Sequence, residues 1–125
     1  KAADPYYSDQ VDVIKSVHHL ITKDLTQRFT IEELSKKYLI NSSALKKIFK
    51  SVYGLPIASY MKEYRIRQAA VLLRESQESI ASVARRVGYE SQSKFTSAFK
   101  SVMDMLPTDY RKQYQRENCR KDTRR

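Results

Sequence analysis

Apolar residues recur along most of the chain at the three- and four-residue spacing of helices that bury one face. Between residues 9 and 25 the apolar stripe consists of Val13, Val17, Leu20, Ile21 and Leu25. The same spacing returns later, at Leu45, Ile48, Phe49 and Val52 and again at Phe95, Ala98, Phe99 and Val102. No stretch alternates apolar and polar residues long enough to favour a strand. The pattern therefore predicts an all-α protein.

Capping and breaking residues divide this pattern into about seven helices. Thr30 and Glu33 have the spacing of a capping box, and Asn41 or Ser42 can cap the next helix. Pro56 suits the first turn of the longest helix. The expected segments are 9–25, 30–38, 42–54, 56–75, 79–88, 91–102 and 107–114.

The second half of the chain repeats the first. The tetrapeptide FKSV occurs at 49–52 and again at 99–102, and upstream apolar and basic positions match at a separation of 49. Each copy reads as a short helix, a turn and a second helix, which is a helix-turn-helix unit. We therefore predict units at 9–55 and 76–115, joined by a linker helix over 56–75. Residues 1–8 are expected to be the remnant of an interdomain linker, and residues 116–125 a basic disordered tail.

The turn of each unit makes a specific demand on its sequence. In the second unit Ala84 allows close helix packing, and Gly88, four residues later, can take a left-handed conformation without a Cβ clash. The first unit has Ser35 and Leu39 at the equivalent positions. Leucine with a positive φ would cost about 1–2 kcal/mol. The first turn is therefore expected to be built differently.

The second helix of each unit has a polar face without acidic residues. In a helix-turn-helix protein this helix enters the DNA major groove, where lysine can donate to guanine and glutamine can pair with adenine. A helix of about 20 residues is about 30 Å long, close to the repeat of B-DNA, so the linker helix would allow both units to reach adjacent grooves. The two faces offer Ser42, Ser43, Lys46, Lys47 and Lys50, and Gln92, Ser93, Lys94, Thr96, Ser97 and Lys100.

Charge adds to this picture through its position rather than its total. The formal net charge is +10, and half of the excess lies between Arg111 and Arg125. Between Glu33 and Glu63 there are six lysines and no acidic residue. This window includes the first polar face and is where a polyanion is expected to bind.

Other chemistries find little support in the sequence. Adjacent histidines such as His18 and His19 point about 100° apart on a helix, so we expect neither a metal site nor a cofactor. No nucleophile has a recognisable base and orienting partner, so we expect no enzyme. Cys119 is the single cysteine, which fits a reducing cytoplasm. Two alternatives to DNA binding remain: a module for an acidic protein partner, and a weaker one, peripheral membrane binding through the basic linker helix.

The segments VARRVGYESQSKFTSAFKSV and PTDYR, with Leu34-Ser35, Gly54, Arg65-Ile66 and Leu72-Leu73, resemble the C-terminal DNA-binding domain of AraC/XylS bacterial transcription regulators. The resemblance covers roughly residues 11–114. It implies double-stranded operator DNA as partner, transcriptional control (more often activation) with RNA polymerase as a candidate partner, and an N-terminal sensor or dimerisation domain upstream of Lys1. It also implies a cytoplasmic, nucleoid-associated protein.

The same resemblance assigns roles to the polar faces. Asp104 and Leu106 depart from the family pattern, so the segment 103–111 is expected to pack differently, outside the reading face. The base-reading positions carry over to Ser43, Lys46 and Lys47 and to Gln92, Ser93, Lys94 and Ser97. The other polar positions are expected to contact phosphates, namely Ser42, Lys50, Ser91, Thr96 and Lys100.

Overall fold

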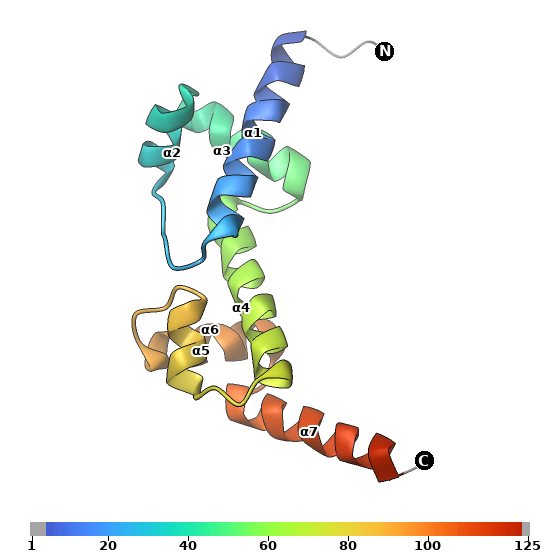
Figure 1. The fold of residues 1–125 in the computed structure, drawn as a ribbon. Coiled ribbons are helices and arrows are strands. Elements are labelled where there is room, and N and C mark those ends of the chain that lie inside the picture. Colours follow the sequence, from blue (N-terminus) through green and yellow to red (C-terminus); the bar gives the residue numbers. More distant parts are fainter. Residues whose placement is uncertain (1–4, 124–125) are drawn as a thin grey trace. The chain divides into compact units, whose positions relative to one another are not determined.

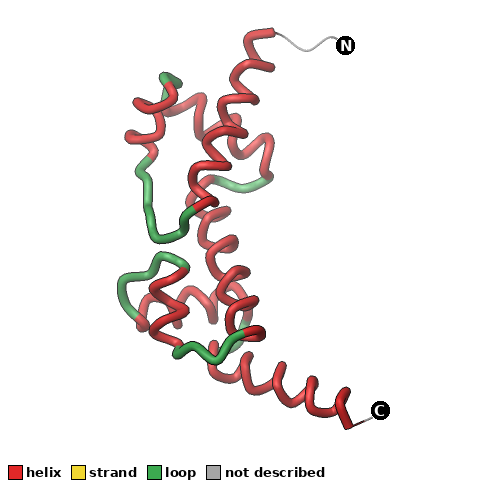
Figure 2. Tube along the Cα trace, in the orientation of Figure 1, coloured by secondary structure: helices red, strands yellow, loops and turns green. Residues whose placement is uncertain are grey.

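The computed structural model describes residues 5–123, with side chains described from residue 9 to residue 115. Over this range the chain is helical, with short connections and no strand (Figures 1 and 2). The all-α prediction is confirmed. The seven helices are α1 (Pro5–Lys23), α2 (Ile31–Tyr38), α3 (Ser42–Tyr53), α4 (Ile57–Glu75), α5 (Ile80–Arg86), α6 (Gln92–Met103) and α7 (Pro107–Thr123).

The chain packs as two units, the first ending at Met61 and the second beginning at Lys62. Unit 1 contains α1, α2, α3 and the start of α4, and unit 2 contains the rest of α4 with α5, α6 and α7. Each unit thus holds one helix-turn-helix pair, α2–α3 or α5–α6. This is the duplicated arrangement that the repeat predicts.

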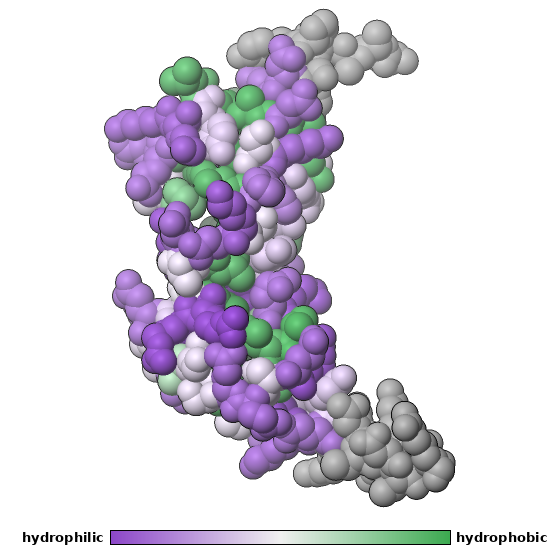
Figure 3. All heavy atoms as spheres, viewed as in Figure 1, coloured by the Kyte–Doolittle hydropathy of each residue, from purple (hydrophilic) through white to green (hydrophobic). Residues whose placement is uncertain are grey.

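Unit 1 is built around the face that α1 and α3 share. Ile14 and Val17 of α1 are fully buried, as are Leu45 and Phe49 of α3, and Leu34 of α2 completes this core. Burial of such side chains contributes about 1.5–3 kcal/mol each, so this face decides how α3 is oriented. The opposite face of α3 is left at the surface. Hydrophilic residues make up most of the coloured surface in the view of Figure 3.

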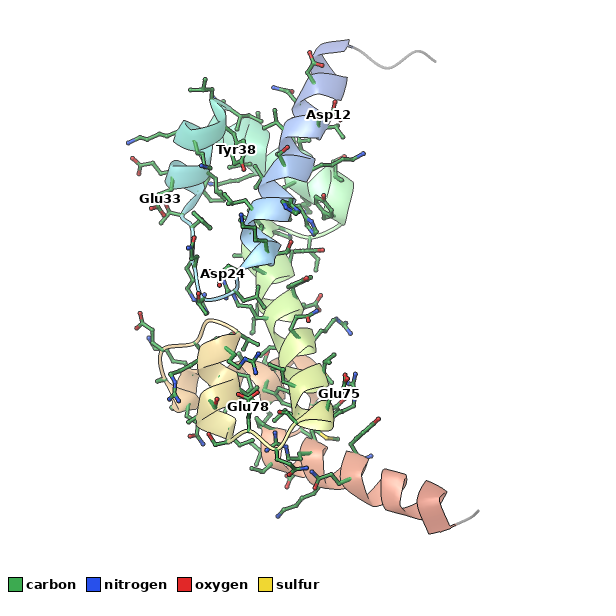
Figure 4. All side chains as sticks on the ribbon, in the orientation of Figure 1. Asp12, Asp24, Glu33, Tyr38, Glu75 and Glu78 are labelled. Carbon is green, nitrogen blue, oxygen red and sulfur yellow. The ribbon has the colours of Figure 1, made fainter. Side chains whose placement is uncertain are left out.

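Local sequence signals begin the two short helices of unit 1 as expected. The Thr30 hydroxyl accepts from the Glu33 amide at 3.0 Å, and the Glu33 carboxylate accepts from the Thr30 amide at 2.8 Å, which forms the predicted capping box. Glu33 lies in the first turn of α2 (Figure 4). Asn41, one of the two expected residues, caps α3 by accepting from the amides of Ser43 and Ala44, and Ser42 is the first helical residue.

The turns of the two units are built in the same way, which corrects the expectation for Leu39. Leu39 takes the left-handed conformation, with φ 52° and ψ 45°, and Gly88 has φ 92°. The Ile40 amide donates to the Ser35 carbonyl at 3.1 Å, and the Tyr89 amide donates to the Ala84 carbonyl at 2.9 Å. Leucine adopts this conformation because the six-residue hydrogen-bonded turn requires it. Its side chain, 92% exposed, meets no steric obstacle beyond its own backbone.

Unit 2 buries aromatic rings of α6 against its other helices. Phe95 and Phe99 are fully buried, and their ring centroids lie 5.7 Å from Tyr89 and 5.6 Å from Tyr110 respectively. Asp104 ends α6 with φ 61°, as Gly54 ends α3 with φ 87°. Aspartate tolerates the left-handed conformation better than most residues. The expectation that the segment 103–111 packs differently from the family pattern stays a prediction.

Both terminal helices are longer than expected. Helix α1 begins at Pro5 instead of Asp9, because proline suits the first helical position. Residues 5–8 are thus helical, and residues 1–4 lie outside the described part of the chain, so their role as a linker remnant stays a prediction. Helix α7 continues past Tyr114 to Thr123, where a disordered tail was expected, because no glycine or proline interrupts this segment. Arg124 and Arg125 lie outside the described residues.

Candidate nucleic-acid interface

Helix α3 presents its predicted reading residues to solvent. Ser43, Lys46, Lys47 and Lys50 are exposed, and Ser42 is half-buried. They are exposed because the intervening apolar residues turn the other face of α3 into the core of unit 1. The structure thus brings all five predicted residues of α3 to one helix, and only Ser42 is partly covered.

The lysines of this face have no carboxylate partner among the described side chains. Lys36 on α2, by contrast, pairs with Glu32 at 3.2 Å. Lys46, Lys47 and Lys50 lie within one helical turn of each other, so their charges add at one place. A face of this kind attracts a polyanion and gains from counterion release when it neutralises phosphates.

A groove runs beside this lysine face. It has a volume of about 520 Å³ and lies between α3, the start of α2 and the start of α4. Its apolar lining comes from Ile31, Pro56, Ile57 and Ala58, and its polar rim from Ser43 and the three lysines of α3. A surface of this composition can pack against an apolar edge while it places cations next to an anion.

Helix α6 presents a different set of side chains. Gln92, Ser93, Lys94, Ser97 and Lys100 are exposed. They lie between buried apolar residues of the same helix, so they share its outer surface. Thr96 is half-buried. The face combines an amide, hydroxyls and two cations, whereas α3 relies on three cations and serine.

Ser91 is the N-cap of α6. Its hydroxyl oxygen accepts from the Lys94 amide at 3.1 Å. A serine hydroxyl has one donor and two acceptor lone pairs, so the capping bond leaves its O–H available to a phosphate. Ser91 can therefore hold the helix start and contact an anion at the same time.

Three arginines of unit 2 that were not among the predicted site residues bond within this unit or are buried in it. Arg111 donates from Nε to the Leu73 carbonyl at 3.0 Å and from Nη1 to the Glu78 carbonyl at 2.7 Å.

Arg86 pairs with the Glu78 carboxylate, which lies next to α5 (Figure 4) and also accepts from Ser82 at 2.8 Å. These bonds lower the pKa of Glu78, the Ser82 hydroxyl first and Arg86 next. Arg65 is buried. Arginine at a family-typical position was the only available signal.

His18 belongs to the packing of unit 1. Its ring stacks on Tyr53 at 4.3 Å between centroids, and its Nε2 lies 2.7 Å from the Tyr60 hydroxyl. Burial and the neighbouring His19 lower the pKa of His18. Among the described residues no group of three or more potential ligands could hold a metal ion. Within the same part of the chain no helix is long and apolar enough to cross a membrane.

Comparison with known proteins shows which family has this architecture. A family model described as a helix-turn-helix domain matches residues 34–113, a range that runs from α2 into α7. The chain belongs to the AraC-type helix-turn-helix family. The resemblance inferred from the sequence is thereby confirmed for the family, and so is the prediction of helix-turn-helix units.

Curated relatives of the AraC-type chain include two proteins named as transcription regulators. The transcriptional activator RhaR of Mannheimia succiniciproducens is 31% identical over 108 residues, covering 86% of this chain and 39% of RhaR. An AraC-like transcription regulator of Streptomyces lividans is 35% identical over 100 residues, covering 80% of this chain and 33% of that protein. The TetD protein of transposon Tn10 in Escherichia coli is 32% identical, with 80% and 72% covered. The chain thus spans less than half the length of the first two.

Solved structures share the fold. The C-terminal domain of AraT, a response regulator from Geobacillus stearothermophilus, matches with a TM-score of 0.76 and 27% identity, covering 81% of this chain and 84% of AraT's domain. The DNA-binding domain of AdpA, solved in complex with a target DNA, matches with a TM-score of 0.78 and 24% identity, covering 83% and 94%. An AraC-type fold therefore holds the exposed faces of α3 and α6.

Proposed function

We propose that this AraC-type chain binds duplex DNA sequence-specifically as the output domain of a transcription regulator. Helices α3 and α6 would each enter a major groove with their exposed polar faces. The observation that carries the proposal is the pair of acid-free faces at equivalent positions of two helix-turn-helix units. The DNA complex of the AdpA domain, which has the same fold, supports this mode of action.

The two faces suit different tasks. On α6, Gln92 can pair with adenine and Lys94 can donate to guanine, and each such contact is worth about 1–3 kcal/mol of discrimination. On α3, Ser43 is short and Lys46 and Lys47 are flexible, so this helix reads bases more weakly and contributes more through phosphates. Ser42, Lys50, Ser91, Thr96 and Lys100 are assigned to the DNA backbone. The groove beside α3 would accept a sugar edge against Ile57, with a phosphate next to Lys50.

The whole regulator is expected to do more than this chain. Because RhaR is longer than the matched region, we propose an additional sensor or dimerisation domain in the full-length protein. RhaR is a transcriptional activator, which supports activation through a contact with RNA polymerase. The cytoplasm, with association to the nucleoid, is the expected location for such a regulator.

Selection of bound duplexes from a randomised pool at about 150 mM salt tests the proposal. We expect an enriched motif with two blocks of preferred bases, one for each unit. A single block would show that one unit, expected to be unit 1, binds mainly the DNA backbone. Binding without enrichment would refute sequence-specific reading. No binding to any duplex would favour an acidic protein as partner.

Substitutions then assign the blocks. Lys94→Ala is expected to change the preferred base at one or two positions of one block, because it removes a donor in the groove. Lys15→Ala is the charge-matched control, because Lys15 is exposed on α1, whose buried face packs against the core side of α3. A uniform loss of affinity for all duplexes with Lys94→Ala would contradict base reading by this residue.

A further inference from the structure

Arg65 is the one charged side chain that is buried among those described between residues 9 and 115. It lies on α4 and is 4% exposed. Its Nη1 donates to the Val87 carbonyl at 2.8 Å. Both residues belong to unit 2. A buried guanidinium stays charged at any physiological pH, so this contact is a charge-assisted hydrogen bond.

The Val87 carbonyl lies at the turn between α5 and α6. It is the C-cap of α5, and Gly88 with its positive φ follows it in the turn that leads to α6. Carbonyls at the C-terminal end of a helix carry partial negative charge, which a cation stabilises. Arg65 therefore fixes the end of α5 to α4 at the point where the chain turns toward the reading helix.

Unit 1 lacks this bond, which the repeat makes visible. Buried residues of α1 and α4 match at a constant separation of 52, with Ile14 and Ile21 corresponding to Ile66 and Leu73, and the two helices end at residues 23 and 75. Arg65 corresponds to Val13, which has no side-chain donor. The first turn must therefore be held by another contact.

That contact is local. In unit 1 the Ser35 hydroxyl donates to the Ile40 carbonyl within the helix-turn-helix itself. In unit 2 Ala84 occupies the place of Ser35 and has no hydroxyl. Beyond the backbone bond that both turns share, the first turn is therefore held by a side-chain bond within α2–α3, and the second by a long side chain from another helix, α4.

We propose that Arg65 is a positioning residue for base reading by α6. By holding the α5–α6 turn against α4, it sets the direction in which α6 leaves the turn and so the register of Gln92 and Lys94 on the bases. This inference rests on the proposed DNA-binding function. Arg65 itself is buried, so it touches no DNA, and its loss should change discrimination more than overall affinity.

The test compares Arg65→Met, which keeps the stem and removes the donors, with Arg65→Lys, which restores one donor and the charge. Each variant's Kd is measured for the selected duplex and for one with the unit 2 block scrambled. Discrimination is the Kd for the scrambled duplex divided by the Kd for the selected duplex. For Arg65→Met we expect this ratio to fall about five- to tenfold, similar to losing one base contact. The Kd for the scrambled duplex should stay within about twofold, and Arg65→Lys should recover part of the ratio.

Ile66→Val is the matched control, because Ile66 is the neighbouring fully buried residue and its side chain has no hydrogen-bond donor. This variant removes one buried methyl group and so lowers stability, but its ratio of Kd values should remain that of the wild type. If Arg65→Met keeps the wild-type ratio, or if Ile66→Val loses it equally, the positioning role is wrong.

Amide hydrogen exchange of the free protein reads the same contact without DNA. Exchange at Tyr89 should accelerate at least about tenfold in Arg65→Met relative to Ile66→Val, because the turn loses its link to α4. Unchanged exchange would overturn the inference even if DNA binding were normal. If exchange accelerates in Arg65→Met but the wild-type protein binds no DNA, the proposed function is refuted and the turn contact is still established.

Discussion

Replacing Leu39 with glycine is expected to stabilise unit 1, although it deletes a large apolar side chain. Leu39 has a positive φ of 52° and is 92% exposed, so its side chain contributes almost no burial. The left-handed conformation costs a leucine about 1–2 kcal/mol. Glycine adopts it freely but loses about 0.5–1 kcal/mol more than other residues through the entropy of the unfolded chain. The net gain should be about 0.5–1 kcal/mol.

Thermal and urea unfolding monitored by circular dichroism measure this gain. For a unit of this size about 0.5–1 kcal/mol raises the midpoint by roughly 2–8 °C. Leu39→Ala is the matched control, since alanine removes the side chain but keeps the Cβ that makes the conformation unfavourable. Its stability should stay within about 0.5 kcal/mol of the wild type. If alanine stabilises as much as glycine, removal of the exposed apolar surface is the cause and the conformational argument fails.

Gly54→Ala reverses the experiment within the same unit. Gly54 has φ 87°, and an added Cβ would meet no atom within 4 Å. Its cost is therefore conformational alone, and we expect a loss of about 0.5–1 kcal/mol. A loss in Gly54→Ala together with no gain in Leu39→Gly would refute the strain assigned to Leu39.

Three further changes test other parts of the structure. Lys50→Ala should weaken binding to all duplexes alike and reduce the slope of log K against log salt by about one unit, whereas an altered base preference would contradict its phosphate role. Burial lowers the pKa of His18, so the unfolded chain takes up a proton at a higher pH than the folded chain does. The free energy of unfolding should therefore fall as the pH drops below about 6.5. His18→Gln should flatten this fall in urea titrations between about pH 7.5 and 5.5. Asn41→Ala should cost about 1 kcal/mol by removing the cap of α3, and Asn41→Asp, which preserves the acceptor, should restore most of it in the same unfolding assay.

The sequence predicted the helices because their signals are local. The spacing of apolar residues placed the buried faces of α3 and α6, and the capping box of Thr30 and Glu33 formed as its spacing requires. The repeat predicted which residues of the two units are equivalent. The exposed faces followed from these two facts, and the structure places the predicted residues there. Their individual DNA contacts stay predictions.

The parts that escaped prediction depend on distant contacts or on weak patterns. Arg65 and Arg111 donate to backbone carbonyls that are 22 and 38 residues away in the sequence, and no local sequence pattern predicts such a bond. Leu39 in a left-handed turn was judged unfavourable by its local cost, and the hydrogen-bonded turn prevailed. Helix α7 beyond Tyr114 has no apolar stripe to mark its length, although its residues favour helix.

The lysine cluster of α3 also has a consequence for the protein when no DNA is bound. Lys46 and Lys50 stand one turn apart, and like charges at this spacing cost a helix about 0.2–0.5 kcal/mol. Added salt screens this repulsion and so stabilises the free unit. The same salt weakens the complex, because it reduces the gain from counterion release. Salt is therefore expected to act with opposite sign on the folding of unit 1 and on its binding to DNA.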